Sequence, residues 1–120
     1  MKTILIIDDD PEIRSLLHDV LTADGYQVLE AADGKQGLAS YAHFQTDLII
    51  TDLVMPEKEG IETIVELRQK FPAVKIIVLS GSGATDLRMA KLLGADRAMS
   101  KPFDISDLLN SVKEVLHSGT

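Results

Sequence analysis

The segment LIITD, residues 48–52, decides how the rest of the chain is interpreted. A mostly apolar run ends in one carboxylate, and a turn signal, Met55-Pro56 followed by Gly60, comes directly after it. A short apolar run bounded by turn residues is typical of a strand that is buried on both faces in a parallel sheet. We therefore expect Asp52 to stand at the carboxyl end of a central strand.

The start of the chain repeats this design. Residues 4–7 are apolar and run directly into Asp8, Asp9 and Asp10. If the two strands are neighbours in one sheet, their terminal carboxylates meet at one edge, and such a cluster repels itself unless a cation is present. The alternative is that the Asp run is only a turn with a helix cap and that Asp52 is a turn residue.

The length and composition indicate one domain with an acidic charge balance. The chain has 120 residues, the size of one ordinary domain, and 45% of them are hydrophobic. Lys and Arg number 12 against 19 Asp and Glu, and this formal net charge of −7 argues against direct binding of nucleic acid. Cysteine is absent, which excludes disulfides and thiolate chemistry. Because neither a membrane span nor a secretory signal is recognisable, we expect a cytoplasmic protein.

Apolar periodicity predicts five strands that alternate with five helices. The expected strands are residues 3–7, 26–30, 48–51, 74–79 and 96–99, and the expected helices begin near residues 11, 33, 61, 86 and 105. This alternation, with short loops, predicts an α/β fold with a parallel sheet and right-handed crossovers, in one domain that covers residues 1–120. In such sheets the binding site lies at the carboxyl ends of the strands, where the strand order reverses.

Four of the five predicted strands place polar side chains at that edge. These side chains are Asp8 and Asp9 after the first strand, Asp52 after the third, Ser80 after the fourth and Lys101 after the fifth. Carboxylates, a hydroxyl and an ammonium group around a hard cation such as Mg²⁺ suit phosphoryl transfer. A carboxylate can itself be the nucleophile and form an aspartyl phosphate. Each of these residues alone could be an ordinary loop residue, so the hypothesis rests on the four strand ends together.

Other chemical motifs are incomplete in this sequence. Residues 81–86 begin like a dinucleotide-binding fingerprint, but Asp86 stands where the third glycine belongs, and the segment follows the fourth strand instead of the first. His18, His43 and His117 are scattered without the spacing of metal ligands. The sequence has neither a Walker loop nor a Gly-x-Ser-x-Gly nucleophile elbow.

The ordered set of residues resembles the receiver domain of two-component response regulators, including the single-domain regulators of chemotaxis. The match covers essentially the whole chain: Asp8-Asp9, Asp52 with Met55-Pro56 and Gly60, Ser80, and Lys101-Pro102-Phe103. The resemblance implies a doubly wound, flavodoxin-like sheet of order 2-1-3-4-5. It also implies a phosphorylation-activated signalling switch that is not a turnover enzyme.

By that resemblance, Asp52 is the phosphoacceptor, and its donor is a phosphohistidine on a sensor histidine kinase or a phosphotransfer domain. Asp9 and Asp52 would bind Mg²⁺ directly, together with the backbone carbonyl of Val54. Asp8 would act through a bound water.

Ser80 and Lys101, by the same resemblance, would contact the phosphoryl oxygens, and the Lys101-Pro102 bond would be cis. Phosphorylation would shift the face made by the fourth helix, fifth strand and fifth helix between two states. An unknown downstream protein would bind this face, and the resemblance also allows a homodimer through it.

The sequence departs from the family at residue 98. The fifth-strand position that usually holds Tyr or Phe is Ala98, so the usual aromatic rotamer switch cannot report on Ser80. We expect either a weaker conformational response or one that is carried by the loop of residues 80–85 and by Met99. The run Gly81-Ser82-Gly83 would lower the barrier to movement of that loop.

Two other functions stay open at this point. A Mg²⁺-dependent aspartyl phosphatase would need an acid–base Asp two residues after Asp52, where this chain has Val54. An inert pseudo-receiver, acting as a structural or dimerising module, would need Asp52 to resist phosphorylation.

Overall fold

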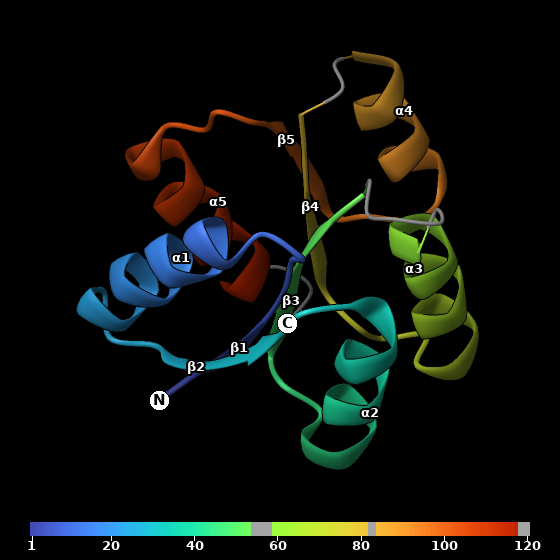
Figure 1. Ribbon diagram of the computed structural model, residues 1–120, viewed down its shortest axis with the longest axis horizontal. Helices are drawn as coiled ribbons and strands as arrows, with labels where there is room; N and C mark the ends of the chain where they lie inside the picture. The colour runs from blue at the N-terminus through green and yellow to red at the C-terminus, as the bar shows by residue number, and fades with distance from the viewer. Residues whose placement is uncertain (54–58, 82–83, 118–120) are drawn as a thin grey trace.

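A computed structural model describes residues 1–53, 59–81 and 84–117, which form a five-stranded sheet with helices on both faces (Figure 1). The strands are β1 (Thr3–Ile7), β2 (Gln27–Ala31), β3 (Leu48–Asp52), β4 (Ile76–Ser80) and β5 (Arg97–Ser100). The helices are α1 (Pro11–Ala23), α2 (Gly34–Phe44), α3 (Glu59–Lys70), α4 (Ala84–Leu92) and α5 (Ile105–His117). Within these ranges, none of the helices is long and apolar enough to cross a membrane.

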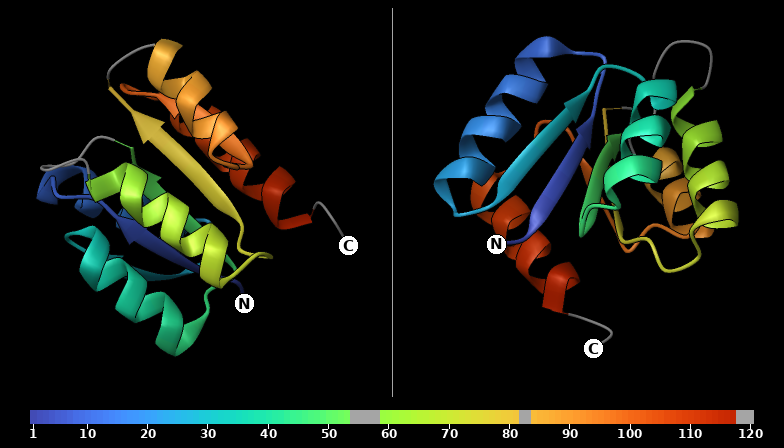
Figure 2. Two further views of the ribbon diagram at one scale, coloured as in Figure 1. Left: turned by 90° about the vertical axis from the view of Figure 1, so that its right-hand side faces the viewer. Right: turned by 90° about the horizontal axis from the view of Figure 1, so that it is seen from below.

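The strand order is β2-β1-β3-β4-β5, and each pair of neighbouring strands is parallel. Figure 2 shows the strand arrows pointing in one common direction. The predicted α/β fold, the alternation of strands and helices and the flavodoxin-like order are therefore confirmed. From β1 the chain continues to β2 at one edge of the sheet, and from β3 it continues to β4 and β5 toward the other edge. The carboxyl ends of β1 and β3 therefore form the topological switch point.

The ends of several elements differ from those predicted. The apolar pattern starts the second strand at residue 26 and the fourth at residue 74, but the amide of Tyr26 donates to the carbonyl of Leu21, and that of Val74 to Phe71. The first bond closes the end of α1 and the second closes the turn after α3, so the ladders of β2 and β4 begin later. The fifth strand likewise begins at Arg97 instead of residue 96, and α4 begins two residues before the expected start.

Three helices begin with an aspartate cap. The carboxylates of Asp10, Asp33 and Asp104 accept hydrogen bonds from the amides of Glu12, Gln36 and Asp107 at 2.9, 2.8 and 3.0 Å. Each bond satisfies one of the orphan amides at a helix start. The first cap also anchors the turn that follows β1, which carries the acidic run.

Two apolar layers hold the helices against the sheet. Ile4 and Ile6 of β1 pack in the layer with α1 and α5, and Leu5 and Ile7 pack in the layer with α2 and α3. Figure 1 shows α1 and α5 on one face and α2, α3 and α4 on the other. Every residue of β3 and β4 is buried, as the sequence predicts for the third strand.

Helix α4 buries fewer of its described side chains than α3 or α5 does. Among the side chains described at residues 86–92, only Ala90 is buried, and Met89 and Leu92 are exposed. A helix that buries little apolar surface has little holding it in one position. This helix follows directly from the carboxyl end of β4.

Candidate metal centre

Three carboxylates gather at the carboxyl ends of β1 and β3. One oxygen from each of Asp8, Asp9 and Asp52 lies within 4.8 Å of the others. Asp52 is the last residue of β3, and the pairing of Ile7 with Thr51 aligns the two strand ends. The structure thus brings together the acidic residues that the sequence analysis singled out, and this group of oxygens could hold a metal ion.

Lys101 reaches the same cluster from the loop after β5. Its Nζ donates to Asp8 Oδ2 at 2.9 Å and to Asp52 Oδ2 at 3.0 Å. Its backbone amide donates to the carbonyl of Ser80, and the peptide bond to Pro102 is cis, as the resemblance implied. One ammonium group therefore bonds two of the three carboxylates, and these four side chains together carry an excess of negative charge.

The surroundings of Lys101 keep it protonated. Burial lowers the pKa of the ammonium group, but the hydrogen bonds and charges of Asp8 and Asp52 more than offset this, so the pKa lies above its usual value. The side chain of Lys101 is 18% exposed. At neutral pH it is thus a fixed positive charge beside Asp52.

Asp8 is the most constrained of the three carboxylates. It is 2% exposed, and its Oδ1 accepts from the amide of Asp10 at 2.9 Å while its Oδ2 accepts from Lys101. Asp9, by contrast, is exposed to solvent. The two consecutive residues therefore present different chemistry: Asp8 is held by the protein, and Asp9 faces outward.

A contact that the sequence analysis missed holds the loop after β1. Arg14 of α1 donates from one guanidinium nitrogen to the carbonyl of Asp8 at 2.6 Å, and its Nε lies 3.6 Å from a carboxylate oxygen of Glu30. His18 lies 3.4 Å from the other oxygen of Glu30. The only hint in the sequence is a basic residue one turn into the helix that follows the acidic run.

Gly60 allows α3 to begin close to the candidate site. A Cβ atom on this residue would collide with the carbonyl oxygens of Leu53 and Asp52. A residue with a side chain would therefore push the start of α3 away from the end of β3. Val54, whose carbonyl was expected to bind the metal, and Met55-Pro56 lie outside the described residues.

Ser80 is the last residue of β4 and is fully buried. Asp52 pairs with Leu79 in the sheet register, which places Ser80 next to the end of β3. The Oγ of Ser80 donates to Asp86 Oδ2 at 3.3 Å. In the sequence, Asp86 was noted as a helix start and as a mismatch to the dinucleotide fingerprint, so its role as the partner of Ser80 was missed.

A hollow of about 430 Å³ lies beside Ala98, between α4, β5 and the start of α5. Its lining includes Leu87, Ala98, Met99, Ser100, Pro102, Phe103, Asp104 and Asp107. Ala98 itself is partly buried against the core. The small side chain at this position therefore leaves space between α4 and the sheet.

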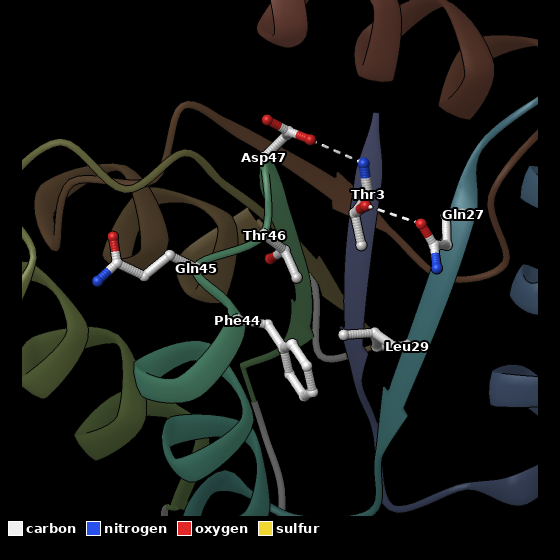
Figure 3. A pocket seen from close by; sticks show the side chains of 7 residues that line it. All are labelled: Thr3, Gln27, Leu29, Phe44, Gln45, Thr46 and Asp47. Atoms are coloured by element: carbon white, nitrogen blue, oxygen red, sulfur yellow. Dashed lines mark hydrogen bonds between the residues drawn. The ribbon is translucent and has the colours of Figure 1, made fainter. Parts of the chain in front are cut away.

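A second hollow, of about 290 Å³, lies at the opposite end of the sheet, where β1 and β2 begin (Figure 3). Thr3 bonds two other residues of this lining. Its amide donates to Asp47 at 2.8 Å, and its hydroxyl donates to Gln27 at 3.5 Å. Among its seven lining residues Asp47 is the single charged group, and a backbone amide already occupies it. We therefore assign the chemistry to the acidic cluster.

Known proteins resemble this chain in sequence and in fold. The sequence profile of the response regulator receiver domain matches residues 4–113. The chain is 42% identical over 123 residues to the KDP operon transcriptional regulatory protein KdpE of Escherichia coli (strain K12), covering 100% of this chain and 54% of that protein. It is 35% identical over 116 residues to the sporulation initiation phosphotransferase F of Bacillus subtilis (strain 168), covering 96% of this chain and 94% of that protein.

Solved structures agree with the sequence comparison. The response regulator protein TrrA from Thermotoga maritima, solved in complex with Mg(2+)-BeF, has a TM-score of 0.87 and 34% identity, covering 96% of this chain and 99% of that chain. The chain belongs to the response regulator receiver domain family of two-component systems. It spans about half the length of the transcriptional regulators that it matches.

Proposed function

We propose that this chain is a phosphorylation-activated switch of a two-component phosphorelay, in which Asp52 accepts a phosphoryl group from a phosphohistidine. The observation that carries the proposal is the bridge from Lys101 to both Asp8 and Asp52 next to the outward-facing Asp9. A nucleophilic carboxylate, a fixed ammonium group and spare oxygen ligands are then in one place. Membership of the receiver family supports the same assignment.

The donor set suits Mg²⁺. Carboxylate oxygens within 4.8 Å of one another are hard ligands of the kind that this ion prefers, and it usually keeps several waters. Asp9 and Asp52 would bind it directly, with the carbonyl of Val54. Asp8, whose two oxygens accept hydrogen bonds from the protein, would act through a water. When bound, the ion would offset the negative charge of the carboxylates and of the phosphoryl group.

The residues of this chain have separate roles in the transfer. A carboxylate oxygen of Asp52 attacks phosphorus, the phosphorus–nitrogen bond of the donor breaks, and the imidazole nitrogen leaves with the electron pair and takes up a proton from solvent. Lys101 donates to a phosphoryl oxygen, and the hydroxyl of Ser80 donates to another. Later attack of water on phosphorus restores the carboxylate and releases inorganic phosphate, so the chain ends the cycle unchanged.

The partners follow from this role. The donor is a sensor histidine kinase or a phosphotransfer domain, and the protein acts in the cytoplasm as one domain of residues 1–120. The face made by α4, β5 and α5 passes the change to a downstream protein, and a homodimer through the same face is compatible with it. The chain has no direct contact with nucleic acid or a membrane in this scheme.

Intact mass after incubation with a small-molecule phosphoryl donor tests the proposal. We expect the native chain to gain one phosphoryl group only when Mg²⁺ is present, and Asp52→Asn to gain none. Asp19→Asn, an exposed position on α1, is the matched control and should behave as the native chain does.

Two results would contradict the proposal. If the native chain binds Mg²⁺ but gains no mass, the chain is an inert pseudo-receiver. If it hydrolyses a generic phosphate ester with repeated turnover, it is an aspartyl phosphatase.

A further inference from the structure

We propose that Asp86 restrains Ser80 in the unphosphorylated chain and thereby slows the phosphoryl transfer. In the unphosphorylated chain Asp86 holds the hydroxyl of Ser80, and the phosphoryl group on Asp52 takes this hydroxyl over. The exchange releases the first turn of α4. This inference rests on the proposed function, because it needs a phosphoryl group on Asp52.

The contact has the properties that an exchangeable bond needs. Ser80 Oγ donates to Asp86 Oδ2 at 3.3 Å, and a hydroxyl has only one proton to donate. Ser80 is fully buried and Asp86 is partly buried, so the bond is sheltered from water. Its length exceeds the roughly 2.5–3.0 Å that is usual for a hydroxyl donor, which makes it weak. A better acceptor can therefore displace Asp86 at small cost.

Ser80 stands between two acidic groups. On one side is the end of β3, since Asp52 pairs with Leu79 in the sheet register. On the other side is Asp86 in the first turn of α4. Phosphorylation adds negative charge and acceptor oxygens on the Asp52 side only. The hydroxyl then turns toward the phosphoryl group, and Asp86 loses a donor while the negative charge nearby increases.

Helix α4 is able to respond to that loss. Ala90 is the only buried side chain described at residues 86–92, so apolar packing restrains the helix weakly. Leu87, the next residue after Asp86, borders the hollow of about 430 Å³ beside Ala98. The Ser80–Asp86 bond therefore gives this chain a route from the acidic site to α4 that does not need an aromatic ring at residue 98.

Asp107 provides a control that tests whether the role of Asp86 is purely structural. An acidic residue in the first turn of a helix is stabilised by the helix dipole whatever else it contacts. Asp86 is the third residue of α4, and Asp107 is the third residue of α5. Asp86→Asn and Asp107→Asn therefore lose the same dipole interaction, and only the first replaces the charged acceptor of Ser80 with a neutral, weaker one.

The first measurement is the initial rate of phosphorylation by a small-molecule donor with Mg²⁺. We expect Asp86→Asn to react roughly three- to tenfold faster, because a larger fraction of the chain has the hydroxyl available. Asp107→Asn should match the native rate. Amide spectra of unphosphorylated Asp86→Asn should place residues 84–90 closer to their phosphorylated positions than in the native chain.

The second measurement asks whether the effect acts through Ser80. In a Ser80→Ala background the substitution Asp86→Asn should no longer change the rate, which a merely structural effect on α4 would not predict. Equal rates in Asp86→Asn and the native chain, equal acceleration in Asp107→Asn, or acceleration that persists without Ser80 would each overturn this inference alone. A native chain that gains no phosphoryl group would overturn the proposed function as well.

Discussion

The two ends of the sheet each contain a partly buried cation, but the two cations are balanced differently. At the amino-terminal end, Arg68 of α3 donates to the carbonyls of Val74 and Gly94 and lies 3.2 Å from a carboxylate oxygen of Asp96. Asp96 also accepts from the amide of Ile76 at 2.8 Å. Two carbonyls and one carboxylate thus accept from the terminal nitrogens of Arg68 and tie α3 to the starts of β4 and β5, although its buried Nε has no hydrogen-bond partner among the described residues.

At the carboxyl end, Lys101 bonds two of the three clustered carboxylates, and among these four side chains negative charge is in excess. Basic and acidic side chains therefore have different roles at the two ends of the sheet. At the amino-terminal end, Arg68 and Asp96 connect secondary-structure elements, while the acidic cluster keeps negative charge that a divalent cation can neutralise. Mutual repulsion among carboxylates destabilises the folded chain when no ligand is bound. Such a cluster therefore indicates a binding function more strongly than the ion pair of Arg68 and Asp96 does.

Removing the cation at the amino-terminal end should have the largest effect on stability. We expect Arg68→Met to lower the free energy of unfolding by about 2–4 kcal/mol, because Asp96 and two carbonyls lose their donor. Urea unfolding monitored by circular dichroism measures this, and addition of Mg²⁺ should not restore it. Arg88→Met, an exposed position on α4, is the control and should stay within about 0.5 kcal/mol of the native chain.

Removing the cation at the carboxyl end should have a smaller effect that Mg²⁺ reverses. Without divalent cations, Lys101→Met leaves the buried carboxylate of Asp8 without its ammonium partner, and we expect a loss of about 2 kcal/mol. Urea titrations with and without Mg²⁺ should show more stabilisation by the ion in this variant than in the native chain. If Mg²⁺ did not restore the lost stability, Lys101 would have a purely structural role like that of Arg68, which would contradict the comparison. Lys113→Met, exposed on α5, is the control.

Removing one carboxylate should change stability in the opposite direction. Asp52→Asn keeps the shape of the side chain and removes one of three repelling charges, so without Mg²⁺ we expect stability to stay equal or rise by up to about 1 kcal/mol. Mg²⁺ at ten times its Kd should stabilise the native chain by about 1.4 kcal/mol and the variant by less. Thermal unfolding at several Mg²⁺ concentrations checks both statements, and a destabilised Asp52→Asn would contradict the comparison.

The smallest expected effect is on alkaline unfolding. The folded pKa of Lys101 lies above the usual value of 10.5, since Asp8 and Asp52 outweigh the lowering by burial. The folded state therefore holds this proton more tightly than the unfolded chain, and its contribution is complete below the usual value and is lost as pH rises through the folded pKa. The stability gap between the native chain and Lys101→Met should stay constant up to about pH 10 and narrow above it.

The residues at strand ends were accessible to sequence reasoning. In a parallel sheet the carboxyl ends of all strands share one edge, so recognising the strands places Asp52, Ser80 and Lys101 near one another without any knowledge of side-chain geometry. The exact strand ends were less accessible. They depend on which amides join the ladder, and the amide of Tyr26 joins the end of α1 instead.

The partners of those strand-end residues could not be predicted in the same way. Arg14 and Asp86 lie on polar or half-buried helix faces, where apolar periodicity says nothing about which side chain points at which strand end. Their contacts depend on helix rotation and on single side-chain rotamers. Arg68 is a similar case, since its acceptors are carbonyl groups that any residue supplies.

The contacts of Lys101 also have a consequence for how the protein is made. They join residues that are 93 positions apart for Asp8 and 49 apart for Asp52. Contacts of such long range form late, after the intervening strands have paired. During synthesis the first three strands emerge before Lys101 does, so a nascent chain carries its carboxylates without their ammonium partner until the fifth strand has been translated. Truncation before residue 101 would leave the acidic cluster in the chain without its ammonium partner and without the core residues of α5.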